Sequence, residues 1–416
     1  MKSRIIILGI DGVPFELMDK LSNKGIMTNF KELKEEYTFR PIKSSIPAIS
    51  SVSWSSMITG KNPGEHGIYG FSQIIKNTYT LSFPNFNALK SLPFWLQDSH
   101  KKHIIINVPS TYPAKKLNGF HIAGFISLDL EKAVYPKEFA KVLKDMNYEI
   151  DIDAKLAKQQ SKESFFNELF RILNIRKKVF DLLWKEPNWD NYLAVITGSD
   201  RLGHFLWNAY EDDKNQYHQK FIDYFQEIDK IIGDFKNKLE ENDVFIILSD
   251  HGMELNEYNV NLNTYLEMEG YLKLSNDSKN YNRIQKESKA FVLDAGRVYL
   301  NKKDIYPNGT INKENEKEII EELKNLFYDL KFSNKKVIKK VYEKEEIYFG
   351  NYIDAAPDLV LIENKGFNLK GNVGKRDIFE KENELSGKHN ENAFIFINKE
   401  INQKELSIEN VLGLLR

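Results

Sequence analysis

The chain has 416 residues, 41% of them hydrophobic, which is enough to form the core of one large domain with insertions or of two domains. Its 59 basic and 60 acidic residues nearly cancel, so no overall field attracts nucleic acid or an anionic membrane. Cysteine is absent, which excludes disulfides, thiolate metal sites and a cysteine nucleophile.

The first residues, MKSRIIILGIDG, have the basic start and the apolar run of a signal peptide. The run is too short, however, and it ends at Asp11 and Gly12 without a small-residue cleavage site. It is better explained as a buried first strand. Because no apolar stretch approaches the roughly 18 residues of a membrane helix, we expect a soluble, cytoplasmic protein with no membrane partner.

Short apolar runs along the chain predict buried parallel strands at residues 4–10, 103–108, 192–197, 244–248, 359–362 and 393–397. Between them, charged segments with helical spacing predict helices over residues 165–184, 217–240 and 314–330. Strands that alternate with helices favour an α/β fold with a mostly parallel sheet. Two regions fit this alternation poorly, and we interpret them as insertions that cover or flank the sheet.

Three of the predicted strands end in an aspartate: IIILGIDG at Asp11, LAVITGSD at Asp200 and VFIILSDHG at Asp250. Taken singly, each aspartate could be a turn residue or a helix cap. Ligands of open α/β sheets, however, bind at the carboxyl ends of the strands, where three carboxylates would repel one another. A metal cluster among them is the simplest way to remove that repulsion.

Histidines stand close to these aspartates in the sequence. His204 follows Asp200 by four residues, which places both on one helix face, and His251 follows Asp250 directly. His389 lies in a turn before the last apolar run. Aspartate and histidine without sulfur suit zinc, and manganese is also possible. These ligands suffice for two ions, and paired ions about 3.5–4 Å apart suit phosphoryl transfer.

A serine-rich stretch, ISSVSWSSMITGKNPGEHGIYGF at residues 49–71, is the candidate source of a nucleophile. Its composition alone does not distinguish a catalytic hydroxyl from a serine-rich loop that leads into a helix. A hydroxyl at a helix N-terminus would meet the positive end of the helix dipole and free N–H groups that can receive phosphate oxygens.

In this order and context, these residues resemble the metal-site motifs of the alkaline phosphatase superfamily. The resemblance is closest to the type I phosphodiesterase/nucleotide pyrophosphatase group and to a branch of predicted phosphohydrolases and phosphomutases. It runs nearly end to end through SWSSMITGKNPGEHGIYGF, NVPSTYP, SDRLGHFLW, LSDHGM, GRVYLN and AAPDLVLI.

The resemblance implies one alkaline-phosphatase-like domain over residues 1–416, with helices on both faces of a mostly parallel sheet in a three-layer α/β/α arrangement. Its core would consist of residues 1–71, 100–125, 190–255 and 345–416. The insertions would be residues 72–190, as a cap, and residues 255–345.

The resemblance also implies roles for single residues. The family's nucleophile lies ten residues before the glycine of a Thr-Gly pair, and counting back from Gly60 gives Ser50. Ser50 would attack phosphorus and form a phosphoseryl intermediate. Two divalent ions, zinc or manganese, would be held by one set of Asp200, His204 and His389 and a second set of Asp11, Ser50, Asp250 and His251.

Substrate contacts follow less directly from the sequence. Asn107 could donate its amide to the substrate, with a buried turn amide as the alternative role, and Arg297 could hold phosphate or form a salt bridge. His66 is expected to be a structural turn residue. Aromatic side chains could stack on a base or a sugar, or simply pack a lid onto the body, at Tyr79, Phe83, Phe86, Phe94 and Trp95.

We therefore expect a two-metal phosphohydrolase for a small phosphate monoester or phosphodiester, with no nucleic acid polymer as partner. A sulfatase is set aside because the residues after Ser50 lack the proline and arginine of the sulfatase motif. A phosphomutase and a non-catalytic binding protein remain alternatives. The sequence lacks the pattern that phosphomutases have around the serine. A non-catalytic binding protein would have lost metal ligands, and none of the seven is lost. The sequence leaves the oligomeric state open.

Overall fold

The computed structural model describes residues 3–152, 161–275 and 280–415. The chain folds into two compact units. Unit 1 comprises Met1–Lys61, Asn85–Glu254 and Glu384–Arg416, and unit 2 comprises Asn62–Pro84 and Leu255–Asn383. The expected cap at residues 72–190 is thus divided between the units, and so is the expected core segment at residues 345–416. Residues 153–160 of that cap lie outside the described residues.

Among the described residues, the main sheet of unit 1 has eight strands in the order β2-β20-β9-β1-β8-β5-β6-β7. The strands are β1 Ile5–Ile10, β2 Thr38–Lys43, β5 His103–Val108, β6 Gly119–Ala123, β7 Val134–Tyr135, β8 Asn191–Ile196, β9 Val244–Leu248 and β20 Asn392–Ile397. The inner strands β9, β1, β8, β5 and β6 are all parallel. The expected α/β class with a mostly parallel sheet is therefore confirmed.

The expected parallel direction is wrong for two of the six predicted strands. The run at residues 393–397 forms β20, which is antiparallel to both β9 and β2. The run at residues 359–362 forms β16 (Leu359–Glu363), which belongs to unit 2 and is antiparallel to its neighbours. An apolar run indicates burial on both faces but contains no information about direction, which the connecting segments decide.

Alternating side chains of these strands bury opposite faces of the sheet. On one face, Ile7, Leu193 and Ile246 pack in a core cluster with Trp54 and Met57 of helix α3 (Ser50–Thr59). On the other face, the neighbouring positions meet long helices. The Tyr192 hydroxyl donates to the carbonyl of Phe180, and the ring of Phe245 stacks on that of Phe235.

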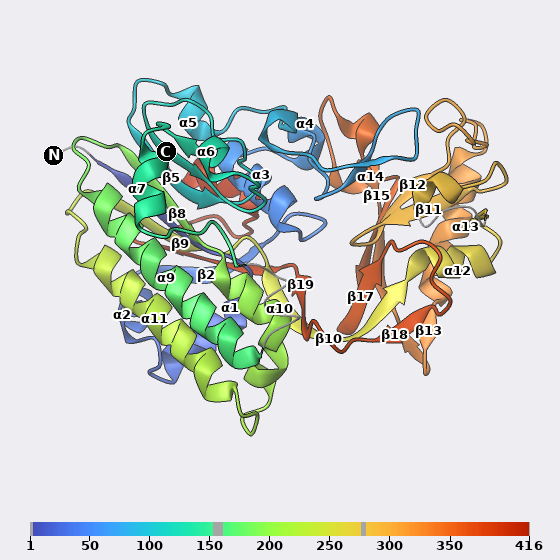
Figure 1. Ribbon diagram of the computed structural model, residues 1–416. Helices are drawn as coiled ribbons and strands as arrows, with labels where there is room; N and C mark the ends of the chain where they lie inside the picture. The colour runs from blue at the N-terminus through green and yellow to red at the C-terminus, as the bar shows by residue number, and fades with distance from the viewer. Residues whose placement is uncertain (1–2, 153–160, 276–279, 416) are drawn as a thin grey trace. The chain divides into compact units, whose positions relative to one another are not determined.

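The helices of unit 1 flank both faces, so the unit has the expected three layers. Helices α9 and α11 lie side by side along one face (Figure 1). They correspond to the predictions at residues 165–184 and 217–240. The helices and short helical turns of unit 1 are α1 Phe15–Asn23, α2 Thr28–Glu36, α3, η1 Phe86–Ala88, α5 Phe94–Gln97, α6 Leu130–Ala133, α7 Phe139–Asp145, α9 Lys162–Trp184, α10 Gly198–Glu211, α11 His218–Lys236 and η4 Ile408–Leu415.

Unit 2 has its own core and two sheets in the described residues. One has the order β11-β12-β16-β15, and in the other β17 and β18 pair with β10 (Gly252–Asn261), which begins in unit 1. The strand β19 (Gly387–Asn390), which also pairs with β10, belongs to unit 1. The expected helix at residues 314–330 is α13. The elements are β3 Gln73–Ile74, β4 Leu81–Ser82, β11 Ala290–Leu293, β12 Arg297–Leu300, β13 Lys331–Phe332, β14 Lys335–Lys336, β15 Ile338–Glu343, β17 Gly366–Lys370, β18 Phe379–Lys381, α4 Pro63–His66, α12 Leu262–Met268, α13 Glu316–Asp329, α14 Lys344–Ile347, η2 Tyr281–Arg283 and η3 Ile353–Ala355.

Within these described ranges, no helix combines the length and the apolar character that crossing a membrane requires.

Candidate metal centre and nucleophile

The three aspartates meet at one edge of the sheet in unit 1. Asp11 directly follows β1, Asp200 lies in the first turn of α10 after β8, and Asp250 lies just beyond β9. Because β9, β1 and β8 are adjacent and parallel, their carboxyl ends share this edge. Gly12 allows the close approach: its φ is +70°, and a Cβ there would lie 2.9 Å from an Asp200 carboxylate oxygen.

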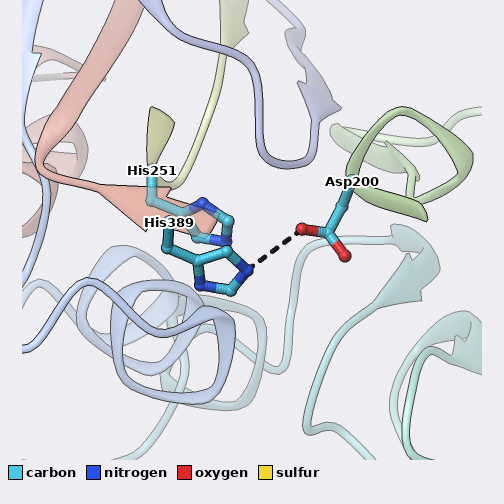
Figure 2. Close-up of side chains that lie close together, drawn as sticks. All are labelled: Asp200, His251 and His389. Atoms are coloured by element: carbon cyan, nitrogen blue, oxygen red, sulfur yellow. Dashed lines mark hydrogen bonds and ion pairs between the residues drawn. The ribbon is translucent and has the colours of Figure 1, made fainter. Parts of the chain in front are cut away.

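Three histidines complete the cluster. His389 Nε2 lies 3.2 Å from Asp200 Oδ1 and 2.9 Å from His204 Nε2. The ring of His251 stacks on that of His389 with centroids 3.7 Å apart (Figure 2). His251 Nε2 also lies 3.3 Å from Asp250 Oδ2, so one histidine adjoins both the Asp200 and the Asp250 sides of the cluster. Residues far apart in the sequence thus form one site.

Each of these histidines uses its other ring nitrogen in the same way. The Nδ1 atoms of His204, His251 and His389 each lie 3.0 Å from a backbone carbonyl, of Gly387, Gly252 and Ala48 respectively. A carbonyl oxygen only accepts, so each Nδ1 carries a proton, and Nε2 is the atom that each ring turns to the cluster and that a neutral ring offers to a metal. This carbonyl–histidine arrangement is the usual support of metal-ligating imidazoles.

The donor set fits a cation. The Nε2 lone pairs of His204 and His389 face each other at 2.9 Å, which is repulsive unless a positive charge lies beside them. Asp250 Oδ1 accepts a hydrogen bond from the Gly12 N–H at 3.1 Å, whereas the fully buried Oδ2 of Asp250 accepts no hydrogen bond. A buried carboxylate oxygen with no donor is costly, and a metal ion would satisfy it.

The pKa values of the side chains indicate the same requirement. Burial, together with the charges of Asp250 and Asp200, raises the pKa of Asp11 well above its usual value. Burial and the charge of Asp200 raise the pKa of Asp250 to about 8. Burial and the neighbouring histidines lower the pKa of His389 to about 3, so its ring is neutral and able to bind a metal.

Asp200 differs from the other two aspartates. Burial alone would raise the pKa of Asp200, but His204, His389 and Arg201 outweigh burial and hold the pKa below its usual value. Asp200 is therefore the carboxylate that is most firmly ionised in the cluster.

The raised pKa of Asp250 predicts a pH-dependent stability of the metal-free protein. A carboxyl with a pKa of about 8 in the folded state and about 4 in the unfolded state contributes its stability fully below pH 4. That contribution is lost as the pH rises through about 8, because the folded state must then ionise Asp250 beside Asp11 and Asp200. Thermal unfolding in chelator should therefore show the melting temperature falling between pH 5 and 8.

The Asp250→Asn variant supplies the control for this effect. An uncharged side chain should flatten the fall in chelator and raise the melting temperature at pH 8. With zinc added, the order should reverse, because wild type gains a metal ligand that the variant lacks. Equal pH profiles for both proteins in chelator would contradict the assigned shift.

Ser50 begins helix α3 beside this cluster. Its Oγ lies 3.0 Å from His251 Nε2 and 3.5 Å from Asp11 Oδ1. As the first residue of the helix, it has a free N–H group, as does Ser51, because these groups have no intrahelical acceptor. The other serines of the helix bond within the fold. Ser53, for example, lies 2.7 Å from the Ser45 hydroxyl, and Ser55 donates to the Ser51 carbonyl.

The structure brings the seven predicted metal ligands together in unit 1. Two groups have ligand atoms close enough to hold one ion each: Asp200, His251 and His389, and Asp11, Asp250 and His251. The expected first set contains His204 in place of His251. The division of ligands between two ions therefore stays a prediction.

The two predicted substrate contacts belong to different units. The Asn107 side chain is buried, with its amide nitrogen 3.3 Å from both the Val195 carbonyl and the Thr197 hydroxyl. Arg297 belongs to unit 2, where it is 1% exposed and donates to the carbonyls of Asp294 and Ser72. Both side chains have structural partners, and their contact with substrate stays a prediction.

The other residues that the sequence singled out differ in their burial and contacts. His66 is buried at the end of α4, where its Nδ1 accepts the Ile68 N–H. Burial lowers the pKa of His66 to about 3. Trp95 packs edge-on against Phe94 within unit 1, whereas Phe83 is 67% exposed. The aromatics therefore include both buried and exposed side chains.

Sequence reasoning missed Trp54, which orients a candidate ligand. Its Nε1–H donates to Asp11 Oδ2 at 3.0 Å. The ring reaches Asp11 because Gly9 has no side chain; a Cβ there would lie 2.4 Å from a Trp54 ring carbon. Trp54 follows Ser50 by one helical turn, and this spacing is the sequence signal that could have indicated it.

The sheet is mostly parallel and has helices on both faces. Its strand ends bring aspartates and histidines to a serine at the start of a helix. Together these features define an alkaline-phosphatase-like hydrolase. The chain belongs to the type I phosphodiesterase / nucleotide pyrophosphatase family, whose model matches residues 5–391. It is therefore a hydrolase of phosphoric esters.

Solved structures with this fold cover nearly the whole chain. Phosphonoacetate hydrolase from Sinorhizobium meliloti 1021, in complex with phosphonoformate, is 14% identical with a TM-score of 0.65, over 99% of this chain and 95% of that one. Murine ectonucleotide pyrophosphatase/phosphodiesterase 5 is 12% identical with a TM-score of 0.54, over 99% of this chain and 94% of that one. At these identities the likeness is one of fold. No curated protein matches the chain.

Proposed function

We propose that this protein is a two-metal phosphohydrolase in which Ser50 is the nucleophile and forms a phosphoseryl intermediate. The observation that supports this most is the position of Ser50 Oγ, 3.0 Å from His251 Nε2 and 3.5 Å from Asp11 Oδ1. A hydroxyl within this cluster of buried carboxylates and imidazoles is positioned to be activated, whereas Ser53 and Ser55 of the same helix bond to another serine and to the backbone.

Asp200, His204 and His389 would hold one ion, and Asp11, Ser50, Asp250 and His251 the other. Zinc suits these nitrogen and oxygen donors, with manganese as the second choice. When bound, the ions lower the pKa of the hydroxyl and of water and stabilise the charge that develops on the phosphoryl oxygens.

The remaining chemistry belongs to side chains and backbone of unit 1. Ser50 Oγ attacks phosphorus in line with the leaving group, and the free N–H groups of Ser50 and Ser51 receive phosphoryl oxygens at the start of α3. The bond from phosphorus to the ester oxygen breaks, and the proton of the Ser50 hydroxyl passes through solvent to that departing oxygen. Water then adds its hydroxyl to phosphorus and its proton to Ser50 Oγ as the Ser50–phosphate bond breaks. The Nδ1–carbonyl bonds keep the three imidazoles oriented throughout both steps.

The substrate class that fits is a small phosphate monoester or phosphodiester. Structural relatives of this fold hold phosphonoacetate in the bacterial hydrolase and AMP in the murine phosphodiesterase. The near-zero net charge supplies no general attraction for a nucleic acid polymer, and we expect a small-molecule substrate. The cytoplasmic location also stays a prediction.

Metal analysis of the purified protein, combined with a substrate panel, tests this function. The panel should include an aryl phosphate, an aryl phosphodiester, AMP and phosphonoacetate, each with zinc, manganese or no added metal. We expect metal-dependent hydrolysis of at least one, and the ratio of monoester to diester activity would define the preference. Transfer of phosphate without its release would favour the phosphomutase. No activity with any metal would favour the binding protein.

A further inference from the structure

Arg201 adjoins the candidate metal centre but is not one of its ligands. It follows Asp200 in α10, and its side chain is 16% exposed. Its Nε and Nη2 atoms both donate to Asp151 Oδ2, at 2.9 Å and 2.6 Å. The guanidinium also lies over the ring of Phe125, 4.2 Å from the ring centroid. One edge and one face of the guanidinium are therefore held in place.

The remaining nitrogen of this guanidinium faces Asp200. Arg201 Nη1 lies 3.6 Å from Asp200 Oδ2, whereas Asp200 Oδ1 lies 3.2 Å from His389 Nε2 and 3.4 Å from His204 Nε2. Figure 2 shows the two carboxylate oxygens accordingly, one directed at His389 and the other away from it. The two oxygens of Asp200 thus have separate surroundings, one cationic and one among imidazole lone pairs.

We propose that Arg201, fixed by Asp151 and Phe125, is a positioning residue for Asp200. It holds Oδ2 and thereby directs Oδ1 towards the ion shared with His204 and His389. This inference rests on the proposed metal-dependent function. It extends that function to two residues, Arg201 and Asp151, that are neither ligands nor nucleophile.

The geometry calls for arginine rather than for a positive charge alone. Nε and Nη2 bond Asp151 side by side while Nη1 remains free to face Asp200, which requires a planar group with several fixed donors. A lysine at position 201 keeps the charge but has one nitrogen to divide between the two carboxylates. Asp200 would then rotate more freely, and the ion would bind less tightly.

A purely structural ion pair is the alternative, and unit 1 contains a matched one. Arg4 donates through Nε and Nη2 to Asp243, its side chain is 17% exposed, and its guanidinium lies over the ring of Trp189. Arg4 precedes β1, whereas Asp11 follows it, so this pair lies at the opposite end of the strand from the candidate site. Arg4→Lys therefore makes the same chemical change away from the metal centre.

The test compares zinc and manganese affinity and the kinetic constants of full-length wild type, Arg201→Lys, Asp151→Asn and Arg4→Lys. We expect Arg201→Lys and Asp151→Asn to weaken metal binding roughly 10- to 100-fold, and saturating metal to restore much of kcat with little change in KM. The Arg201→Lys/Asp151→Asn double variant should lose less than the sum, because both act through one contact. Arg4→Lys should lower the melting temperature but keep wild-type metal affinity.

Three results would overturn the proposal: wild-type metal affinity in both Arg201→Lys and Asp151→Asn, equal weakening in Arg4→Lys, or strict additivity in the double variant. Asp151→Asn keeps the test decisive if Arg201→Lys does not fold. A wild-type protein that binds neither metal would instead overturn the proposed function on which the inference rests. The two failures are thus distinguishable.

Discussion

Replacement of Ser50 by alanine is expected to lower the hydrolysis of phosphate esters by roughly 10³-fold or more, with the fold preserved. The substitution removes the oxygen that lies 3.0 Å from His251 Nε2 but leaves the carboxylate and imidazole ligands in place. Activity that depends on a covalent intermediate cannot then proceed, although the site can still bind metal. The measurement is kcat/KM with the best substrate of the panel, alongside the metal content of the variant.

Ser55→Ala is the matched control for this prediction. Ser55 is a buried serine of the same helix, and its hydroxyl donates to the Ser51 carbonyl at 2.6 Å. The Ser55→Ala variant should therefore keep near wild-type activity. Acid quenching of wild type during turnover should also trap one phosphoryl group on Ser50, detectable by peptide mass spectrometry. Substantial activity in Ser50→Ala, or phosphate trapped on another residue, would exclude Ser50 as the nucleophile.

Removal of metal by a chelator should abolish hydrolysis and lower the melting temperature, and zinc or manganese should restore both. The physical reason is the concentration of buried aspartates at Asp11, Asp200 and Asp250, whose mutual repulsion a divalent cation relieves. Bound metal stabilises the folded state in proportion to the logarithm of its concentration over the dissociation constant. The melting temperature should therefore rise continuously with added metal.

A pair of histidine variants separates a ligand from a structural imidazole. His389→Ala should lower both metal content and the rise in melting temperature with zinc, because it removes a nitrogen 3.2 Å from Asp200. His218→Ala also removes an imidazole ring, but one outside the cluster. The Nδ1 atom of His218 lies 2.8 Å from the backbone carbonyl of Ala209. The His218→Ala variant should leave metal binding unchanged. Unchanged activity in chelator, or equal effects of both variants, would contradict the two-metal proposal.

The strand ends are the part of the site that local sequence predicts best. Each of the runs before Asp11, Asp200 and Asp250 is apolar enough to be buried, and burial in adjacent parallel strands sends the following residue to one edge. The spacing from Asp200 to His204 likewise specifies one helix face. These predictions depend on residues close in the sequence, whose relative positions the regular backbone sets.

The antiparallel direction of β20 and the place of β16 in unit 2 depend on long connecting segments. The apolar pattern of a strand does not encode these connections. The division of the predicted cap between two units has the same cause. Packing against a particular neighbour decides these features, and the identity of that neighbour depends on the whole chain.

The sequence by itself determined the α/β class, the candidate ligands and the choice of Ser50 through family resemblance. Only the tertiary structure decided that His204 and His389 face each other, that backbone carbonyls lie against the imidazoles, and that Arg201 and Trp54 lie beside Asp200 and Asp11. The physical reason is that backbone carbonyls have no sequence signature and that these contacts join distant segments. Their geometry arises only when the strands and helices have packed.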